Sequence, residues 1–151
     1  MTDTSLKERL FLHCKNLMEE KVQSLKVTLS HITESANNET KSSAGDKHET
    51  ARAMMQLEQE KLSRQINEAL QVQSDLLALQ LNAATTVIKG SLISTNRGQI
   101  FIAVALGKIE FEKNTVIAIS DKSPLALKFM GLKEGASIDF NGVDYHITSI
   151  Q

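Results

Sequence analysis

The sequence predicts an α+β fold: an antiparallel helical coiled-coil hairpin followed by a small antiparallel β-sheet domain with one short helix. Three observations lead to this prediction. Two long stretches of similar length carry helical periodicity, a polar segment ending in Gly45 separates them, and from Thr85 the pattern changes to short β-type runs. We therefore expect a hairpin over residues 1–84, with its tip at 45–49, and a second domain over residues 85–151.

The first helix is expected from residue 5 to about residue 36. Its apolar residues recur in steps of three or four, which places them on one face of a helix. Thr4 or Ser5 can cap its start, with Glu8 as the partner of Ser5 in a capping box. The predicted face consists of Leu6, Leu10, Cys14, Leu17, Lys21 or Val22, Leu25, Leu29, Ile32 and Ala36.

The second helix is expected from about Glu49 to Ala83. Helices of about 30 to 35 residues are each roughly 45 to 53 Å long. Their matched lengths and the break midway between them favour a hairpin within one chain over a coiled coil between two chains. A strict seven-residue repeat, typical of a coiled-coil seam, runs through Met55, Leu62, Ala69, Leu76 and Ala83, with Ile66, Gln73 and Gln80 on the same stripe.

The C-terminal region reads as strands separated by turn signals. Asn141-Gly142 is the strongest hairpin signal in the chain, and Asn96–Gly98 is a second turn. Between them, Ser123 and Pro124 start a helix of two turns that Gly131 ends. The expected strands cover residues 86–95, 99–106, 115–120, 138–140 and 145–150.

Composition narrows the possible functions. A net charge of −1 provides no overall basic field for holding nucleic acid unaided, so any such contact must run through a local patch or a protein partner. Aromatic residues make up only 4% of the chain, which argues against a deep aromatic ligand pocket and a small-molecule substrate. One cysteine, Cys14, excludes an internal disulfide and a cysteine-based zinc site. No signal peptide or membrane-spanning run is expected, so we predict a cytoplasmic protein with no membrane partner.

Asp46 and Glu49 stand three residues apart where the second helix begins. They are well placed to cap that helix, and both favour the positive end of its dipole. They can also bind a divalent cation such as Mg²⁺, although two carboxylates rarely complete such a site. The tip can therefore complete a site that a partner provides. His48 has no second histidine or cysteine at metal-ligand spacing, and reads as a solvated loop residue.

Basic residues surround the tip at Lys41, Lys47 and Arg52. They are either solvated or help the tip to enter a space lined with phosphates. No Ser/His/Asp or Cys/His arrangement has a plausible context, and GLKEGA at 131–136 fits neither common phosphate-binding fingerprint.

With these residues in view, the chain resembles the Gre family of bacterial transcript-cleavage factors. Gly45-Asp46-Lys47-His48-Glu49-Thr50-Ala51 is similar to the family's G-D-x-x-E-N-A tip. Residues 119–135, ISDKSPLALKFMGLKEG, are similar to its S-P-(I/L/M)-A-x-x-(I/L)-x-G-x-x-x-G-D segment. The closing run Val143–Ile150 also fits the family's ending.

The resemblance implies an FKBP-like C-terminal domain that docks on the rim of the secondary channel of RNA polymerase, through residues matched here by Asp121, Ser123 and Pro124. The hairpin would then reach down the channel to the 3′ end of the nascent RNA. Asp46 and Glu49 would help to hold Mg²⁺ in the polymerase active centre, where backtracked RNA is hydrolysed. The protein would be an accessory factor rather than an enzyme, with no cofactor of its own.

Three departures from the family pattern keep an alternative open. Lys47 replaces a leucine, Ala53 and Met54 stand where the family has an aromatic residue, and Ser-Ser-Ala precedes Gly45. Some relatives dock in the same channel and regulate the polymerase without cleavage. Two other classes remain open: a stand-alone prolyl isomerase, which the scarcity of aromatic residues disfavours, and a purely structural coiled-coil dimer.

Overall fold

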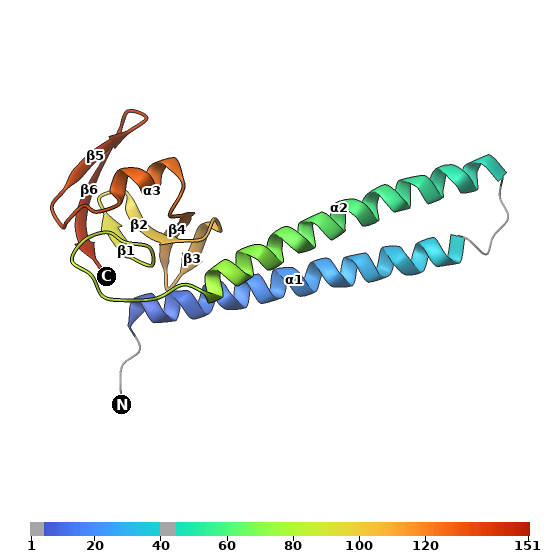
Figure 1. Cartoon of the computed structure of the whole chain (residues 1–151), viewed down its shortest axis with the longest axis horizontal. Helices are drawn as coiled ribbons and strands as arrows, with labels where there is room; N and C mark the ends of the chain where they lie inside the picture. The colour runs from blue at the N-terminus through green and yellow to red at the C-terminus, as the bar shows by residue number, and fades with distance from the viewer. Residues whose placement is uncertain (1–4, 40–44) are drawn as a thin grey trace. The chain divides into compact units, whose positions relative to one another are not determined.

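The computed structural model describes residues 5–39 and 45–151, and its fold is α+β, as predicted (Figure 1). Two long helices, α1 (Leu6–Glu39) and α2 (Gly45–Leu77), come first. The rest of the chain forms a six-stranded sheet and one short helix, α3 (Pro124–Phe129). The strands are β1 (Leu92–Thr95), β2 (Gly98–Ala103), β3 (Gly107–Phe111), β4 (Asn114–Ser120), β5 (Ser137–Phe140) and β6 (Val143–Ile150).

The helix ends agree in part with the sequence-based expectation. Ser5 and Glu8 form the predicted capping box: the Glu8 amide donates to Ser5 Oγ at 3.1 Å, and the Ser5 amide donates to Glu8 Oε2 at 3.2 Å. However, α1 continues to Glu39, and α2 starts at Gly45 and ends at Leu77, before the expected Ala83. Asn82 is exposed and its main-chain carbonyl accepts from Lys7, so the chain beyond α2 gains tertiary partners that a helix pattern does not reveal.

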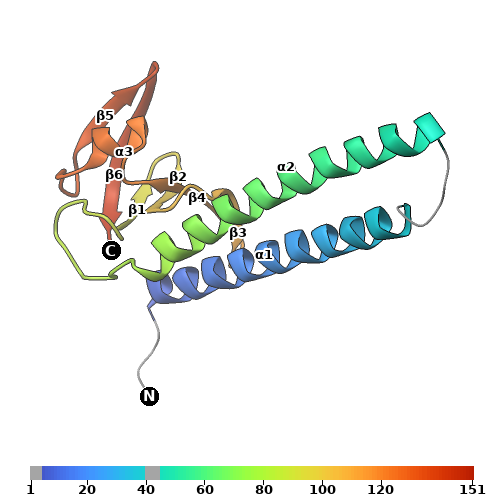
Figure 2. The same cartoon turned by 45° about the vertical axis from the view of Figure 1, so that its right-hand side comes forward.

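Chain segment 16–74 is one compact unit, in which α1 and α2 run side by side (Figures 1 and 2). Gln59 Nε2 donates across the pair to Thr33 Oγ1 at 3.3 Å. Met18 and Val22 of α1 and Leu62, Ile66 and Ala69 of α2 are buried. The helices of one chain therefore pair through an apolar stripe, as predicted.

Met18 rather than Leu17 occupies the buried stripe. Met18 is 2% exposed, while Leu17 is 37% exposed. Steps of four residues lead from Cys14 through Met18 to Val22, which is one of the two ridges that helices use to pack on each other. The prediction of Leu17 is wrong because it placed a step of three where the packed ridge takes a step of four.

The second compact unit combines the start of α1, as far as Lys15, with Asp75–Gln151. Arg9 and Glu112 form a bidentate ion pair with N–O distances of 2.8 and 3.2 Å, and the Arg9 hydrogen bonds hold the pKa of the Glu112 carboxyl below its usual range. The His13 ring lies 5.0 Å from the Phe111 ring, centroid to centroid. The start of α1 thus packs beside the end of β3. The predicted domain boundary at residues 84 and 85 stays a prediction.

The sheet is mixed rather than wholly antiparallel, with strand order β3-β4-β2-β1-β6-β5. β4 pairs with β2 in parallel and with β3 in antiparallel orientation, whereas β1 pairs antiparallel with β2 and β6. The expectation of a purely antiparallel sheet is wrong at this one pair. The sequence analysis did not predict β3. Because β3 lies at the edge of the sheet, β4 can pair between β3 and β2.

The predicted turns are present. Asn141 and Gly142 both have positive φ, 53° and 79°, as a two-residue hairpin turn requires. The β3–β4 turn reaches the same region with two non-glycine residues, Glu112 at 48° and Lys113 at 66°. Such residues pay a conformational cost there, and the ion pair of Glu112 with Arg9 holds one of them in place.

The sheet core lies under α3. Ile100 and Ile102 of β2 pack with Val87, Ile93, Ala126, Phe129 and Ile147 in one buried cluster. Phe101 and Ala103, which point to the opposite side of β2, are also buried. Because both faces of β2 are covered, this strand forms the centre of the unit.

Gly90 offers a direct test of how closely the chain is packed before β1. A Cβ at Gly90 would lie 2.4 Å from the Gln80 carbonyl oxygen, and its φ is +95°. We expect Gly90→Ala to lower the free energy of unfolding by about 3 kcal/mol, because overpacking adds to the left-handed backbone cost. Gly131→Ala is the matched control, with φ +82° and open space around it, and should cost only about 1 kcal/mol. Equal losses in urea denaturation would contradict this packing.

Cys14 should be chemically inert in the folded protein. The residue is fully buried, and burial raises the pKa of its thiol to about 11. We expect a thiol reagent at pH 7.5 to label the native protein far more slowly than the protein unfolded in urea. Labelling at equal rates would show that the start of α1 is not packed as described.

Candidate functional site

The tip acids lie in the first two turns of α2. Asp46 is the second residue of the helix and Glu49 the fifth, and the Glu49 side chain is exposed. Because α2 already starts at Gly45, the backbone at Asp46 is helical, so Asp46 is not the N-cap residue that we predicted. The helix starts earlier than its strongest cap signal, a shift within the usual uncertainty of helix ends.

Residues three apart on a helix lie on the same side, about one turn from each other. The backbone therefore brings Asp46 and Glu49 to one side of the start of α2. Among the neighbouring basic residues, Arg52 is exposed on α2, Lys47 and His48 belong to the same helix, and Lys41 lies outside the described residues.

A metal site would need more than these two acids. In the described part of the chain, no group of three or more His, Cys, Asp or Glu residues could hold a metal ion. Mg²⁺ takes six ligands and usually keeps several waters. Two carboxylates on one helical turn therefore fit a shared site better than a site built by this chain alone, and the predicted metal role stays a prediction.

The three residues predicted to bind a partner come together at the start of α3. Ser123 is the N-cap, and its Oγ accepts from the Ala126 amide at 3.2 Å. Pro124 is the first helical residue and is exposed. Asp121 lies in the preceding turn, and its Oδ1 is 3.9 Å from Lys89 Nζ. Local capping chemistry thus presents an acid and a proline on one small surface.

Leu127 adds an apolar residue to this surface that the sequence analysis did not single out. It is 63% exposed, whereas its neighbours Ala126 and Phe129 are fully buried. Leu127 follows Pro124 by three residues, which places both on the same side of α3. The spacing of three residues between Pro124 and Leu127 is the sequence signal that could have identified Leu127 as part of this surface.

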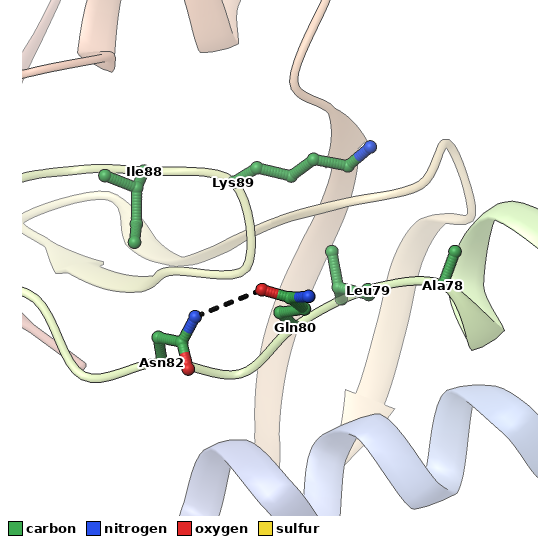
Figure 3. Close-up of a pocket in the computed structure, with 6 residues that line it drawn as sticks. All are labelled: Ala78, Leu79, Gln80, Asn82, Ile88 and Lys89. Carbon is green, nitrogen blue, oxygen red and sulfur yellow. Dashed lines mark hydrogen bonds between the residues drawn. The ribbon is translucent and has the colours of Figure 1, made fainter.

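A hollow of about 380 Å³ lies between the segment that leaves α2 and the turn before β1 (Figure 3). Lys89 is on one side and Gln80 and Asn82 are on the other. No local motif predicts it, because it arises where two segments of the chain approach each other. Its lining residues are Ala78, Leu79, Gln80, Asn82, Ile88 and Lys89.

Two solved structures are similar to this chain at a coarse level. The structure of the transcription factor Gfh1 has 15% sequence identity and a TM-score of 0.35, and the match covers 90% of this chain and 92% of that one. The crystal structure of GreA factor homolog 1 (Gfh1) of Thermus thermophilus has 13% identity and a TM-score of 0.35, covering 95% and 93%. The likeness is too distant to carry a function from these structures to this chain.

No protein-family model matches the chain, and the search of curated proteins gives no match. None of the helices in the described ranges is long and apolar enough to span a membrane.

Ser123 and Asp121 should differ in their effect on stability. Removing an N-cap hydroxyl costs about 1 kcal/mol, so Ser123→Ala should lower the Tm by several degrees. Asp121→Asn should leave the Tm nearly unchanged, because its ion pair is long and the Lys89 side chain is half exposed. Thermal unfolding followed by circular dichroism measures both. A larger loss for Asp121→Asn than for Ser123→Ala would mean that Asp121 holds the fold together.

Proposed function

We propose that this protein is a Gre-like transcription factor that binds RNA polymerase, inserts its hairpin tip into the secondary channel and stimulates cleavage of backtracked RNA. The observation that carries the proposal is the position of Asp46 and Glu49. They lie one turn apart where α2 begins, at the end of the helical pair opposite to residues 16 and 74. Their favourable interaction with the helix dipole is worth about 1 kcal/mol or less at an exposed position, which leaves room for a second role.

The dimensions of the helical pair support this role. Helices α1 and α2 contain 34 and 33 residues, which corresponds to about 50 Å each. Burial decreases towards the tip, where Leu29, Ile32 and Met55 are only half-buried. A long, narrow element with a polar end is suited to entering a channel in a larger protein.

The acids define the chemistry that the tip can contribute. Ionised carboxylates are ligands for a hard cation and acceptors for a water proton. An Mg²⁺ ion held jointly with the polymerase would provide positive charge and a more acidic bound water. In this proposal Asp46 and Glu49 supply ligand oxygens and orientation only, and the polymerase supplies the remaining ligands and the RNA 3′ end. The protein itself is then an accessory factor without a cofactor of its own.

Docking would use the surface around the start of α3. Asp121 and Pro124 are its polar and rigid elements, and exposed Leu127 supplies apolar area. Exposed aliphatic residues beside polar ones are common in transient interfaces.

A second function is favoured by the residues beside the acids. Lys47 follows Asp46 directly, and Ala53 and Met54 stand in place of the family's aromatic residue. A lysine next to the acids introduces positive charge where a cation would bind. The alternative is a regulator that occupies the channel without cleavage.

A backtracked elongation complex tests the role of the acids. We expect the protein to accelerate shortening of the RNA 3′ end, and Asp46→Asn or Glu49→Gln to reduce the rate roughly 100-fold, the loss typical of removing one electrostatic group from a reaction centre. Glu58→Gln is the matched control, an exposed acid further along α2 that should keep full activity.

Each result has a clear meaning. Binding without RNA shortening would support the non-cleaving regulator. Shortening that survives the double variant Asp46→Asn with Glu49→Gln would show that the acids have been wrongly assigned.

Docking is tested separately by the affinity for polymerase. Asp121→Ala and Pro124→Ala should each weaken binding by about tenfold, as expected for residues in an interface centre. Asn114→Ala, at an exposed position at the start of β4, serves as the control. Unchanged binding in both docking variants would place the interface elsewhere on the protein.

A further inference from the structure

Lys89 lies in a turn that is held in place by hydrogen bonds with Ser91. The Ser91 amide donates to the Ile88 carbonyl at 3.0 Å, and the Ile88 amide donates to Ser91 Oγ at 2.9 Å. Ser91 is fully buried, and Gly90 has the positive φ that the third position of a type II turn requires. These bonds leave Lys89 at the outer corner of a rigid turn, with half of its side chain exposed.

The hollow beside Lys89 has fixed walls. The Gly90 amide donates to the Ile102 carbonyl at 2.6 Å, which ties the turn to β2. On the other side, Gly90 lies so close to the Gln80 carbonyl that even a Cβ would not fit. The two neighbouring segments are therefore in backbone contact, and the hollow exists before any partner arrives.

The polar groups around the hollow include strong hydrogen-bond donors. Lys89 lines the hollow on the side opposite to Gln80 and Asn82, and its side chain extends away from their amides (Figure 3). Asn82 Nδ2 donates to Gln80 Oε1 at 3.4 Å. None of the six residues that line the hollow is acidic.

The charge beside the hollow is positive. Lys89 is the one charged residue among the six that line the hollow. Lys122 follows Asp121 in the chain and is exposed. The contact between Lys89 and Asp121 is 3.9 Å long and solvent-screened. The ammonium can therefore accept a second carboxylate without losing a strong interaction.

We propose that Lys89 and the hollow beside it form part of the docking surface and receive a carboxylate side chain of the polymerase. The inference rests on the proposed function, because the partner is the one named there. It adds a contact from the segment before β1 to the surface at the start of α3, and Asp121 connects the two through Lys89. An acidic side chain of the partner would match the Lys89 ammonium in charge.

The competing explanation is that Lys89 only orients Asp121. The two roles differ in a double-mutant cycle. If Lys89 contacts the partner itself, Lys89→Ala weakens binding equally in the wild-type and Asp121→Asn backgrounds. If it acts through Asp121, its effect disappears in the Asp121→Asn background.

The experiment measures the Kd of the full chain for core RNA polymerase by fluorescence anisotropy. We expect Lys89→Ala to weaken binding about tenfold, Lys89→Glu to weaken it more, and Lys89→Arg to retain most of it. Ala78→Phe fills the hollow without changing charge and should also weaken binding. Lys108→Glu, an exposed lysine on β3, is the matched control and should bind normally. Unchanged Tm values show that the variants are folded.

The outcomes separate the inference from the proposed function. Normal binding of both Lys89→Glu and Ala78→Phe, with tight wild-type binding, overturns the inference and leaves the proposed function intact. Loss of the Lys89→Ala effect in the Asp121→Asn background also overturns it, in favour of a positioning role. If the wild type does not bind polymerase at all, the proposed function and the inference both fail.

Discussion

The pairing of two long helices through one narrow apolar stripe is the constraint on which the rest of the structure depends. Helices with so many charged residues gain most of their stability in water from such packing rather than from intrinsic propensity. Met18 and Val22 of α1 and Leu62, Ile66 and Ala69 of α2 are the buried residues of this stripe. Among the described residues nearer the start of α2, Leu29, Ile32 and Met55 are half-buried. This arrangement leaves the start of α2 at the end of the helical pair, with Glu49 exposed to solvent.

The unit that contains the sheet is stabilised in a different way. Its central strand β2 is buried on both faces, and the start of α1 adds contacts beside β3 through Arg9 and His13. Buried Ser91 holds the turn before β1 in place. Gly90 in that turn lies close to Gln80 in the segment that leaves α2. In the proposed function, this turn would belong to a docking surface that loses little binding energy to ordering.

Local signals in the sequence predicted the features that depend on a few neighbouring residues. The Ser5–Glu8 capping box, the Ser123 cap with Pro124 behind it, and the Asn141-Gly142 turn are all present. Features set by distant segments were missed. The parallel pairing of β2 with β4 depends on the position of β3 at the edge of the sheet, and the hollow depends on two segments that approach each other. The acids of the tip were visible as residue types, but their helical backbone position was not, because the cap signal at Asp46 lies inside α2.

In the proposed function, the unit that contains the sheet docks on the polymerase, and the long helical pair brings two acids to chemistry located in the polymerase. A photo-crosslinking amino acid at residue 49, used on a backtracked elongation complex, tests this claim most directly. The account predicts a crosslink to the RNA 3′ end or to the polymerase active centre, and none from the same probe at residue 74 of α2. Crosslinks from residue 49 only to the outer surface of a polymerase that remains bound would contradict it.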